Sequence, residues 1–225
     1  MVPDVARAPG KKRARAEADK QQRRAEILRA AAEAFAKLPY AAVTMAEVAR
    51  RAGLAKGTVY LYHATKESLF LQLVIEALAR WFAEVEAALR GAGRLGPDEL
   101  AALLVETLVV RGDLTRLLPL LHPVLEENID EALALAFKQR LGEQTAAAGE
   151  LLERRCEALA PGEGVRFLLR LHALVIGLHA MATPSPTVAR ILARPELAAL
   201  RIDFAAELQA TVAALLRGWA VPKDR

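Results

Sequence analysis

Cysteine and aromatic residues are scarce in this sequence of 225 residues. The single cysteine, Cys156, excludes an internal disulfide framework and is typical of a protein from a reducing cytosol. No Cys and His residues have the spacing of a metal site, and neither a metal nor another cofactor is expected. Aromatic residues make up 5% of the chain and β-branched runs are few, whereas Ala and Leu are abundant. This composition favours helices over strands and predicts an all-α fold.

Motifs for catalysis and for export are also missing. The sequence has no nucleophile motif, no phosphate-binding loop, and no pair of carboxylates that stands apart from ordinary helix-surface charges. We therefore do not expect an enzyme. No uninterrupted apolar stretch follows the basic residues near the N-terminus, so a secretory signal is not expected and the expected location is cytoplasmic.

Positive charge is concentrated in the N-terminal part of the chain. Residues 1–66 carry 14 Lys and Arg against 6 Asp and Glu, a net charge of +8, and residues 67–225 carry 17 against 21, a net charge of −4. This asymmetry is typical of a polyanion-binding module joined to a weakly acidic body. We interpret residues 1–18, with the run Lys11-Lys12-Arg13-Ala14-Arg15, as a mobile basic arm that attracts phosphate or places an arginine in a minor groove. An ordinary solvated tail is the alternative.

The stretch from Thr44 to Lys66, TMAEVARRAGLAKGTVYLYHATK, predicts two short helices joined by a tight turn. Thr44 and Glu47 have the spacing of a capping box, in which each side chain accepts a hydrogen bond from the other residue's amide. The first helix should therefore start at Thr44, and Gly53 supplies the backbone freedom that ends it. A second helix follows over about 55–62. This arrangement is a helix-turn-helix, whose second helix fits a DNA major groove.

The outward side chains of the second helix suit nucleic acid. They offer a positive charge, a close approach of the backbone, and hydroxyl groups, and the candidates for DNA contact are Lys56, Gly57, Thr58, Tyr60 and Tyr62. Thr44 and Lys66 are candidates for phosphate contacts at the two ends of the motif. The alternative is that the tyrosines are half-buried packing residues and the lysines promote solubility. An upstream helix over 19–38, with apolar residues at helical spacing, completes a three-helix head over 19–66.

The same stretch resembles the DNA-binding signature of the TetR family of bacterial transcriptional regulators. The resemblance is carried by Thr44-x-x-Glu47-Val48-Ala49-x-x-Ala52-Gly53-Leu54-Ala55-x-Gly57-Thr58-Val59-Tyr60-x-Tyr62-x-x-x-Lys66-Glu67-x-Leu69. His63 departs from the pattern, because members of the family usually carry Phe there, packed beneath the recognition helix. The resemblance implies a two-fold dimer and a DNA affinity that responds to a small molecule.

Residues 67–225 are expected to form a helical body for effector binding and dimerisation. A first helix over about 65–89 is roughly 36 Å long and must connect the head with the body. Pro119 and Pro123 fall inside a later helix, which should be kinked or broken. The further helices are expected over about 97–112, 113–125, 130–160, 165–182 and 196–219.

The candidates for an effector cavity are mainly apolar and include two histidines: Trp81, Phe82, Leu104, Leu118, His122, Phe137 and His172. These walls predict a largely apolar effector, with one acceptor or acid group meeting a histidine or Arg111. The alternatives are that Trp81 and Phe82 are ordinary core residues and that His122 is a satisfied histidine at a helix bend. His172 and His179 share one helical face, but they lack a third ligand for a metal.

The helix over 165–182 is apolar on more than one side, so it is either a membrane span or a helix buried by the body and a second subunit. Arg166, Arg170 and two histidines interrupt the stretch, which also falls short of about 20 residues. We therefore expect no membrane partner. Together with the last helix, this element resembles the four-helix dimer interface of the family, and a homodimer through the last two helices is expected.

The sequence therefore predicts a dimeric, cytoplasmic, nucleoid-associated DNA-binding regulator. It is expected to be a repressor that leaves a palindromic double-stranded operator when the effector binds. One alternative is a chromosome-organising protein with the same head and no effector, which a body without a cavity would favour. The other is an enzyme or carrier that the head only localises, which turnover or a bound cofactor would favour.

Overall fold

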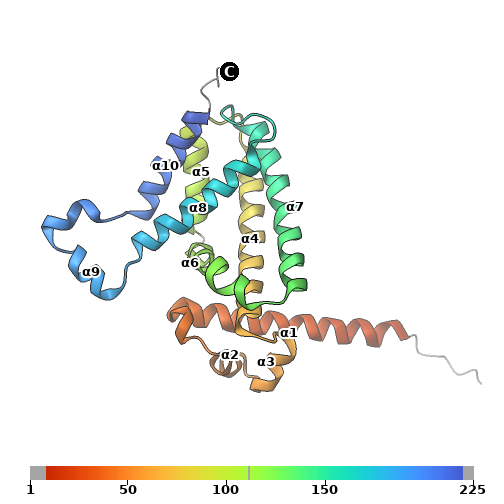
Figure 1. Ribbon diagram of the computed structural model, residues 1–225. Coiled ribbons are helices and arrows are strands. Elements are labelled where there is room, and N and C mark those ends of the chain that lie inside the picture. The colour runs from red at the N-terminus through yellow and green to blue at the C-terminus, as the bar shows by residue number, and fades with distance from the viewer. Residues whose placement is uncertain (1–8, 111, 220–225) are drawn as a thin grey trace, which may run out of the picture. The chain divides into compact units, whose positions relative to one another are not determined.

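The computed structural model describes residues 9–110 and 112–219, and only the backbone of residues 9–13. The regular elements of this part of the chain are helices, and the predicted all-α fold is confirmed. The chain divides between Leu73 and Val74 into two compact units, which we call the head and the body. The sequence predicted this boundary at residue 66, which is the first residue of α4 (Lys66–Gly91). The division lies inside that helix, so α4 belongs to both units (Figure 1).

The first helix of the head, α1 (Pro9–Lys37), begins ten residues before the predicted Asp19. Residues 9–18 are thus helical rather than a mobile arm, because Ala, Lys, Arg and Glu are strong helix formers and Pro is favoured at a helix start. Residues 14–23 are exposed, whereas one face of the second half of the helix is buried. The rest of the predicted arm, residues 1–8, lies outside the described residues.

The predicted helix-turn-helix is present as α2 (Met45–Ala52) and α3 (Lys56–Tyr62). The Thr44 hydroxyl caps α2 by accepting from the Glu47 amide at 3.1 Å, and Gly53 ends it with a left-handed φ of 67°. The return half of the predicted capping box is wrong. The Glu47 carboxylate accepts instead from Arg50 (2.7 Å) and Arg51 (2.6 Å), whose hydrogen bonds lower the pKa of Glu47 to about 2. Charged donors outcompete a neutral amide for the carboxylate.

In the described part of the body, α4 is followed by α5 (Pro97–Val110), α6 (Gly112–Leu120), α7 (Glu131–Arg155), α8 (Gly164–Ala182), α9 (Pro186–Leu192) and α10 (Phe204–Trp219). The helix predicted over 113–125 is broken as expected. Pro119 lies in α6, and Pro123 lies in η2 (Leu121–Leu125), a π-helical turn that leads into the short η3 (Glu126–Asn128). A proline cannot donate to the preceding turn, so the helix changes its hydrogen-bond pattern there.

Helices α7 and α8 cross in close contact at two glycines. A Cβ atom on Gly149 would lie 2.8 Å from the backbone nitrogen of Val165, and one on Gly164 would lie 2.2 Å from the carbonyl oxygen of Gly149. Helix α7 ends at Arg155 rather than the predicted Ala160. The Arg155 carbonyl accepts from the Leu95 amide at 2.7 Å, a bond that the extended backbone around Cys156 permits.

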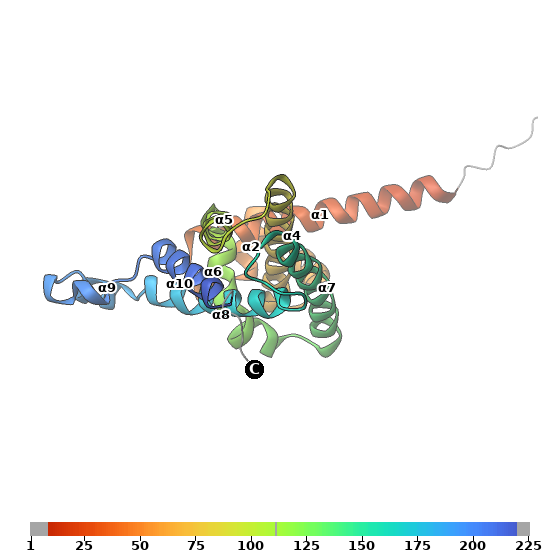
Figure 2. The ribbon, with the colours of Figure 1, turned by 90° about the horizontal axis from the view of Figure 1, so that it is seen from above.

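The helix predicted over 196–219 is also shorter in the structure. Residues 195–200 form the 3-10 helix η4 (Pro195–Leu200), and α10 starts at Phe204 because Asp203 caps it, accepting from the Ala206 amide at 3.0 Å. Helix α9, which was not predicted, extends with η4 away from the other body helices in both views (Figures 1 and 2). Among the described helices, α8 alone is long and apolar enough to cross a membrane, by length and composition only. In the body it contacts α6, α7 and α10.

Candidate functional site

Helix α3 carries five of the seven predicted DNA contacts. Lys56 and Gly57 are exposed in its first turn, and Tyr60 is 42% exposed. Thr58 and Tyr62 are half-buried, while Val59 is fully buried and holds the helix against the head. Side chains that combine a cation with hydroxyl groups are suited to phosphate and base edges.

Leu61 is a further residue of α3 that the sequence analysis did not single out. It is 85% exposed, the highest value among the large apolar side chains of the described residues. In the same helix, the Lys56 ammonium lies 5.8 Å from the centroid of the Tyr60 ring. An apolar side chain at this position is suited to the methyl group of thymine.

Lys66, the predicted phosphate contact, is anchored inside the head. Its ammonium donates to the carbonyl oxygen of Tyr40 at 2.6 Å and lies 3.8 Å from the centroid of the Tyr40 ring. The Tyr40 hydroxyl in turn donates to Glu67 at 2.7 Å. Burial lowers the pKa of Lys66. These contacts fix the start of α4 to the segment between α1 and α2, with the Lys66 side chain half-buried.

His63, which stands where members of the family usually carry Phe, directly follows the last residue of α3. Its Nε2 is buried and has no hydrogen-bond partner among the described residues. Burial, with a smaller contribution from the charge of Arg24, lowers the pKa of His63 to about 4. The imidazole is therefore neutral near pH 7.

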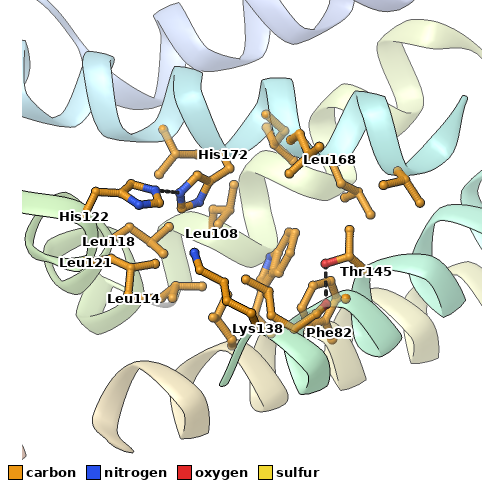
Figure 3. A pocket seen from close by; sticks show the side chains of 18 residues that line it. Phe82, Leu108, Leu114, Leu118, Leu121, His122, Lys138, Thr145, Leu168 and His172 are labelled. Atoms are coloured by element: carbon orange, nitrogen blue, oxygen red, sulfur yellow. Dashed lines mark hydrogen bonds between the residues drawn. The ribbon is translucent and has the colours of Figure 1, made fainter. Parts of the chain in front are cut away.

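The body contains a cavity of about 340 Å³. Its wall is mainly Leu and aromatic side chains contributed by α4, α5, α6, η2, α7 and α8 (Figure 3). The lining residues include Leu78, Trp81, Phe82, Leu108, Leu114, Leu118, Leu121, His122, Lys138, Leu141, Thr145, Leu168, Leu169, His172 and Val175. A concave apolar space with few polar groups is typical of a small-molecule site.

Five of the seven residues predicted for the cavity line it: Trp81, Phe82, Leu118, His122 and His172. The other two, Leu104 and Phe137, are buried and are not among the lining residues. Helix α5 reaches the cavity one turn later, at Leu108. On α7 it is Lys138 that lines the wall, since adjacent helical residues point about 100° apart. Arg111 lies outside the described residues.

The two histidines and the lysine of the wall are linked through Glu126. Nε2 of His122 lies 3.1 Å from Nε2 of His172, as the dashed line in Figure 3 marks. Glu126 joins this pair to Lys138, with one carboxylate oxygen 3.3 Å from Nδ1 of His122 and the other accepting from the Lys138 ammonium at 2.7 Å. Glu126 and Lys138 were not singled out in the sequence, because the four members of this cluster come from different elements, η2, η3, α7 and α8.

Comparison with protein families gives matches over both units. Residues 27–73 match the family described as "Bacterial regulatory proteins, tetR family". Residues 75–223 match the family described as "Tetracyclin repressor-like, C-terminal domain". A comparison with curated proteins gives no match.

Several solved structures share the fold. A transcriptional regulator from Rhodococcus sp. RHA1 has a TM-score of 0.59 at 19% identity, covering 88% of this chain and 98% of that chain. Thermus thermophilus FadR, a TetR-family repressor solved with lauroyl-CoA, has a TM-score of 0.57 at 22% identity, covering 90% and 97%. The fatty acid degradation regulator FadR from Bacillus halodurans has a TM-score of 0.55 at 20% identity, covering 86% and 97%. At these identities the likeness shows the fold.

Proposed function

The chain belongs to the TetR family of bacterial transcriptional regulators, and from that premise we propose that it is a dimeric repressor released from its operator by a small molecule. The effector is largely apolar and binds in the cavity of the body. The operator is palindromic, because the two recognition helices of a two-fold dimer address two equivalent half-sites. Proteins of this family are DNA-binding regulators, and a cytoplasmic, nucleoid-associated location follows from the proposal.

The observation that carries the proposal is the cavity itself. A chromosome-organising protein has no use for an apolar space of about 340 Å³ in its body, and packing free energy favours filling it. Its lining comes from six elements, among them α4, which begins in the head. This favours a ligand-responsive regulator over the alternative without an effector.

In the proposed complex, α3 lies in the major groove with Lys56, Gly57, Thr58, Tyr60 and Tyr62 toward the DNA. Thr44 and Lys66 bind phosphates on either side. The exposed first half of α1, which carries Arg15 and Lys20, adds non-specific attraction to the backbone.

The proposed dimer interface is formed by α8 and α10. Each helix has an exposed row of small residues: Ala173, Gly177 and Ala180 on α8, and Ala206, Ala210, Ala214 and Gly218 on α10. Small side chains at a spacing of about four residues allow helix axes to approach closely. Two such helices from each subunit would form a four-helix interface around a two-fold axis.

Release follows from differential binding. The effector contacts Trp81 and Phe82 of α4 in the cavity and stabilises a position of this helix in which the spacing of the two heads no longer matches the operator. The effector shifts the equilibrium only by the difference between its affinities for the two states.

The test is footprinting of the full-length protein on its own promoter DNA, at moderate salt with excess non-specific competitor. We expect one protected, roughly palindromic site with half-sites about one helical turn apart. Protection without a preferred site would overturn the proposal in favour of the chromosome-organising alternative. A mass measurement in solution checks the dimer, and a monomer on the operator would contradict it.

A further inference from the structure

The wall of the cavity leaves few polar groups free for a ligand. The indole nitrogen of Trp81 donates to the Thr107 hydroxyl at 3.1 Å, and the Thr145 hydroxyl donates to the Leu141 carbonyl at 2.7 Å. The Lys138 ammonium donates to Glu126 at 2.7 Å, so its charge is balanced by a carboxylate. The remaining polar side chains of the wall are the two histidines.

The positions of the protons on the histidine pair follow from its neighbours. The Glu126 carboxylate can only accept, so we assign the ring proton of His122 to Nδ1, 3.3 Å from it. Nε2 of His122 is then an acceptor, and the proton between the rings belongs to Nε2 of His172, which donates at 3.1 Å. The chain of hydrogen bonds thus runs from His172 through His122 to Glu126.

This order leaves Nδ1 of His172 as a hydrogen-bond acceptor. The structure gives this atom no partner among the described residues, and it is not among their fully buried unpaired atoms. Burial is the first cause that lowers the pKa of His172 to about 4, followed by His122 and Lys138, with Glu126 opposing them. The ring is therefore neutral near pH 7, and a neutral imidazole with one nitrogen already donating accepts at the other.

We propose that the effector is an apolar molecule with a single neutral hydroxyl group, a phenol or an alcohol, which donates to Nδ1 of His172. Its hydrocarbon part fills the space between Trp81, Phe82 and the leucines of the wall. This inference rests on the proposed function, in which the cavity is the effector site, and it specifies the chemical class of the ligand.

A carboxylate fits this end of the cavity less well. The acceptor nitrogen of His172 repels an anion, and Lys138, the nearest cation of the wall, is already paired with Glu126. An anion bound at Nδ1 of His172 would require this half-buried ring to take up a proton next to the charge of Lys138. A hydroxyl donor requires no change of protonation and leaves every existing hydrogen bond in place.

The test uses three probes of matched shape and different head groups on the full-length protein near neutral pH. They are para-butylphenol, a donor; para-butylacetophenone, which only accepts; and para-butylbenzoate, an anion. We expect calorimetric titration to give a dissociation constant for the phenol roughly ten-fold below those of the other two, the effect of one hydrogen bond in an apolar site.

Two substitutions separate the hydrogen bond from a general effect on packing. His172→Phe keeps a ring but removes the acceptor, and it should abolish the preference for the phenol. Glu126→Gln should reverse it. Lys138 holds the side-chain oxygen, so the Gln amide group donates to His122, the chain of hydrogen bonds inverts, and His172 then offers a donor to the acetophenone. The matched control is His179→Phe, on the same helix and outside the lining, which should keep the preference of the natural sequence.

Three results would overturn the inference: tightest binding of the benzoate, equal affinities for the phenol and the acetophenone, or no binding of any probe. A preference that survives both His172→Phe and Glu126→Gln would also overturn it. Footprinting scores the proposed function separately. If the protein protects no operator but prefers the phenol, the proposed repressor function is wrong and the proposed ligand site stands. If it protects an operator but shows no preference among the probes, the repressor function stands and the proposed ligand site is wrong.

Discussion

The head and the body place their functional residues in opposite surroundings. In the head, most of the predicted DNA contacts lie on one short helix, α3, and Thr44 caps α2 through a residue three positions away. In the body, the cavity wall is partly buried, with Leu114 fully buried and Leu169 60% exposed, and its residues come from six elements spread over about a hundred residues of sequence. Changes in the head should therefore alter DNA affinity more than stability, and changes in the body should alter stability first.

The largest effect on stability is expected in the body, at the crossing of α7 and α8. Gly149→Ala would place a Cβ atom 2.8 Å from the Val165 nitrogen, so the helices must separate. We expect the free energy of unfolding of the body to fall by about 3 kcal/mol. Both tryptophans, Trp81 and Trp219, lie in the body, so their fluorescence during urea unfolding reports this unit.

The matched control for Gly149→Ala is Gly142→Ala, on the same helix. Its Cβ atom would meet nothing within 4 Å, and alanine is favoured over glycine inside a helix by roughly 0.5–1 kcal/mol. The control should therefore be neutral or slightly stabilising. A similar loss of stability in both variants would show that the close contact at Gly149 does not stabilise the packing of α7 against α8.

His63 is the exception in the head, because it is a buried polar group there. His63→Phe removes the nitrogen that lacks a partner among the described residues, and we expect the head to gain about 2 kcal/mol of stability. The hydrogen exchange of amides in α2 and α3 measures this. Slower exchange is expected, and faster exchange would mean that the phenyl ring does not fit beneath α3.

The same histidine makes the stability of the head depend on pH. The pKa of His63 is about 4 in the folded head and close to 6.5 in the unfolded chain, so the unfolded state binds more protons between these values. Stability is present above about pH 6.5 and falls as the pH is lowered toward 4. The His63→Phe variant should lose this part of the pH dependence, and an unchanged profile would contradict the assignment.

In the head, Lys66→Ala tests the proposed phosphate contact of this half-buried side chain. We expect the affinity for all DNA sequences to fall roughly ten-fold and the slope of log K against log salt to decrease by about one phosphate. Because Lys66 also binds the Tyr40 carbonyl, hydrogen exchange of the head must be compared at the same time. An unchanged salt slope would assign Lys66 to the structure of the head alone.

The smallest effect is expected for Thr44→Ala. Loss of the hydroxyl that accepts from the Glu47 amide should cost α2 about 1 kcal/mol, whereas Thr44→Ser should keep the cap. Hydrogen exchange of the first turn of α2 separates the two variants. Equal protection in both would mean that the Arg50 and Arg51 bonds to Glu47 hold the turn without the cap.

Agreement between sequence and structure differs between the two units for a physical reason. The start and end of α2 were predicted because a cap and a left-handed glycine act within a few residues. The C-terminus of α7 was missed because the Leu95 amide binds the Arg155 carbonyl where the helix ends. The N-terminus of α10 was missed because the helix begins after its cap, Asp203. The predicted DNA contacts and the dimer interface remain predictions.

The sequence by itself determined the all-α fold, the helix-turn-helix, the family, and the concentration of positive charge toward the head. These depend on residue spacing and composition, which act locally or add up along the chain. Only the tertiary structure decided which residues line the cavity, that Lys138 and not Phe137 faces it, and that His122, His172 and Glu126 meet. The helical phase and the crossing of helices set these contacts, and both are fixed by packing between segments far apart in the sequence.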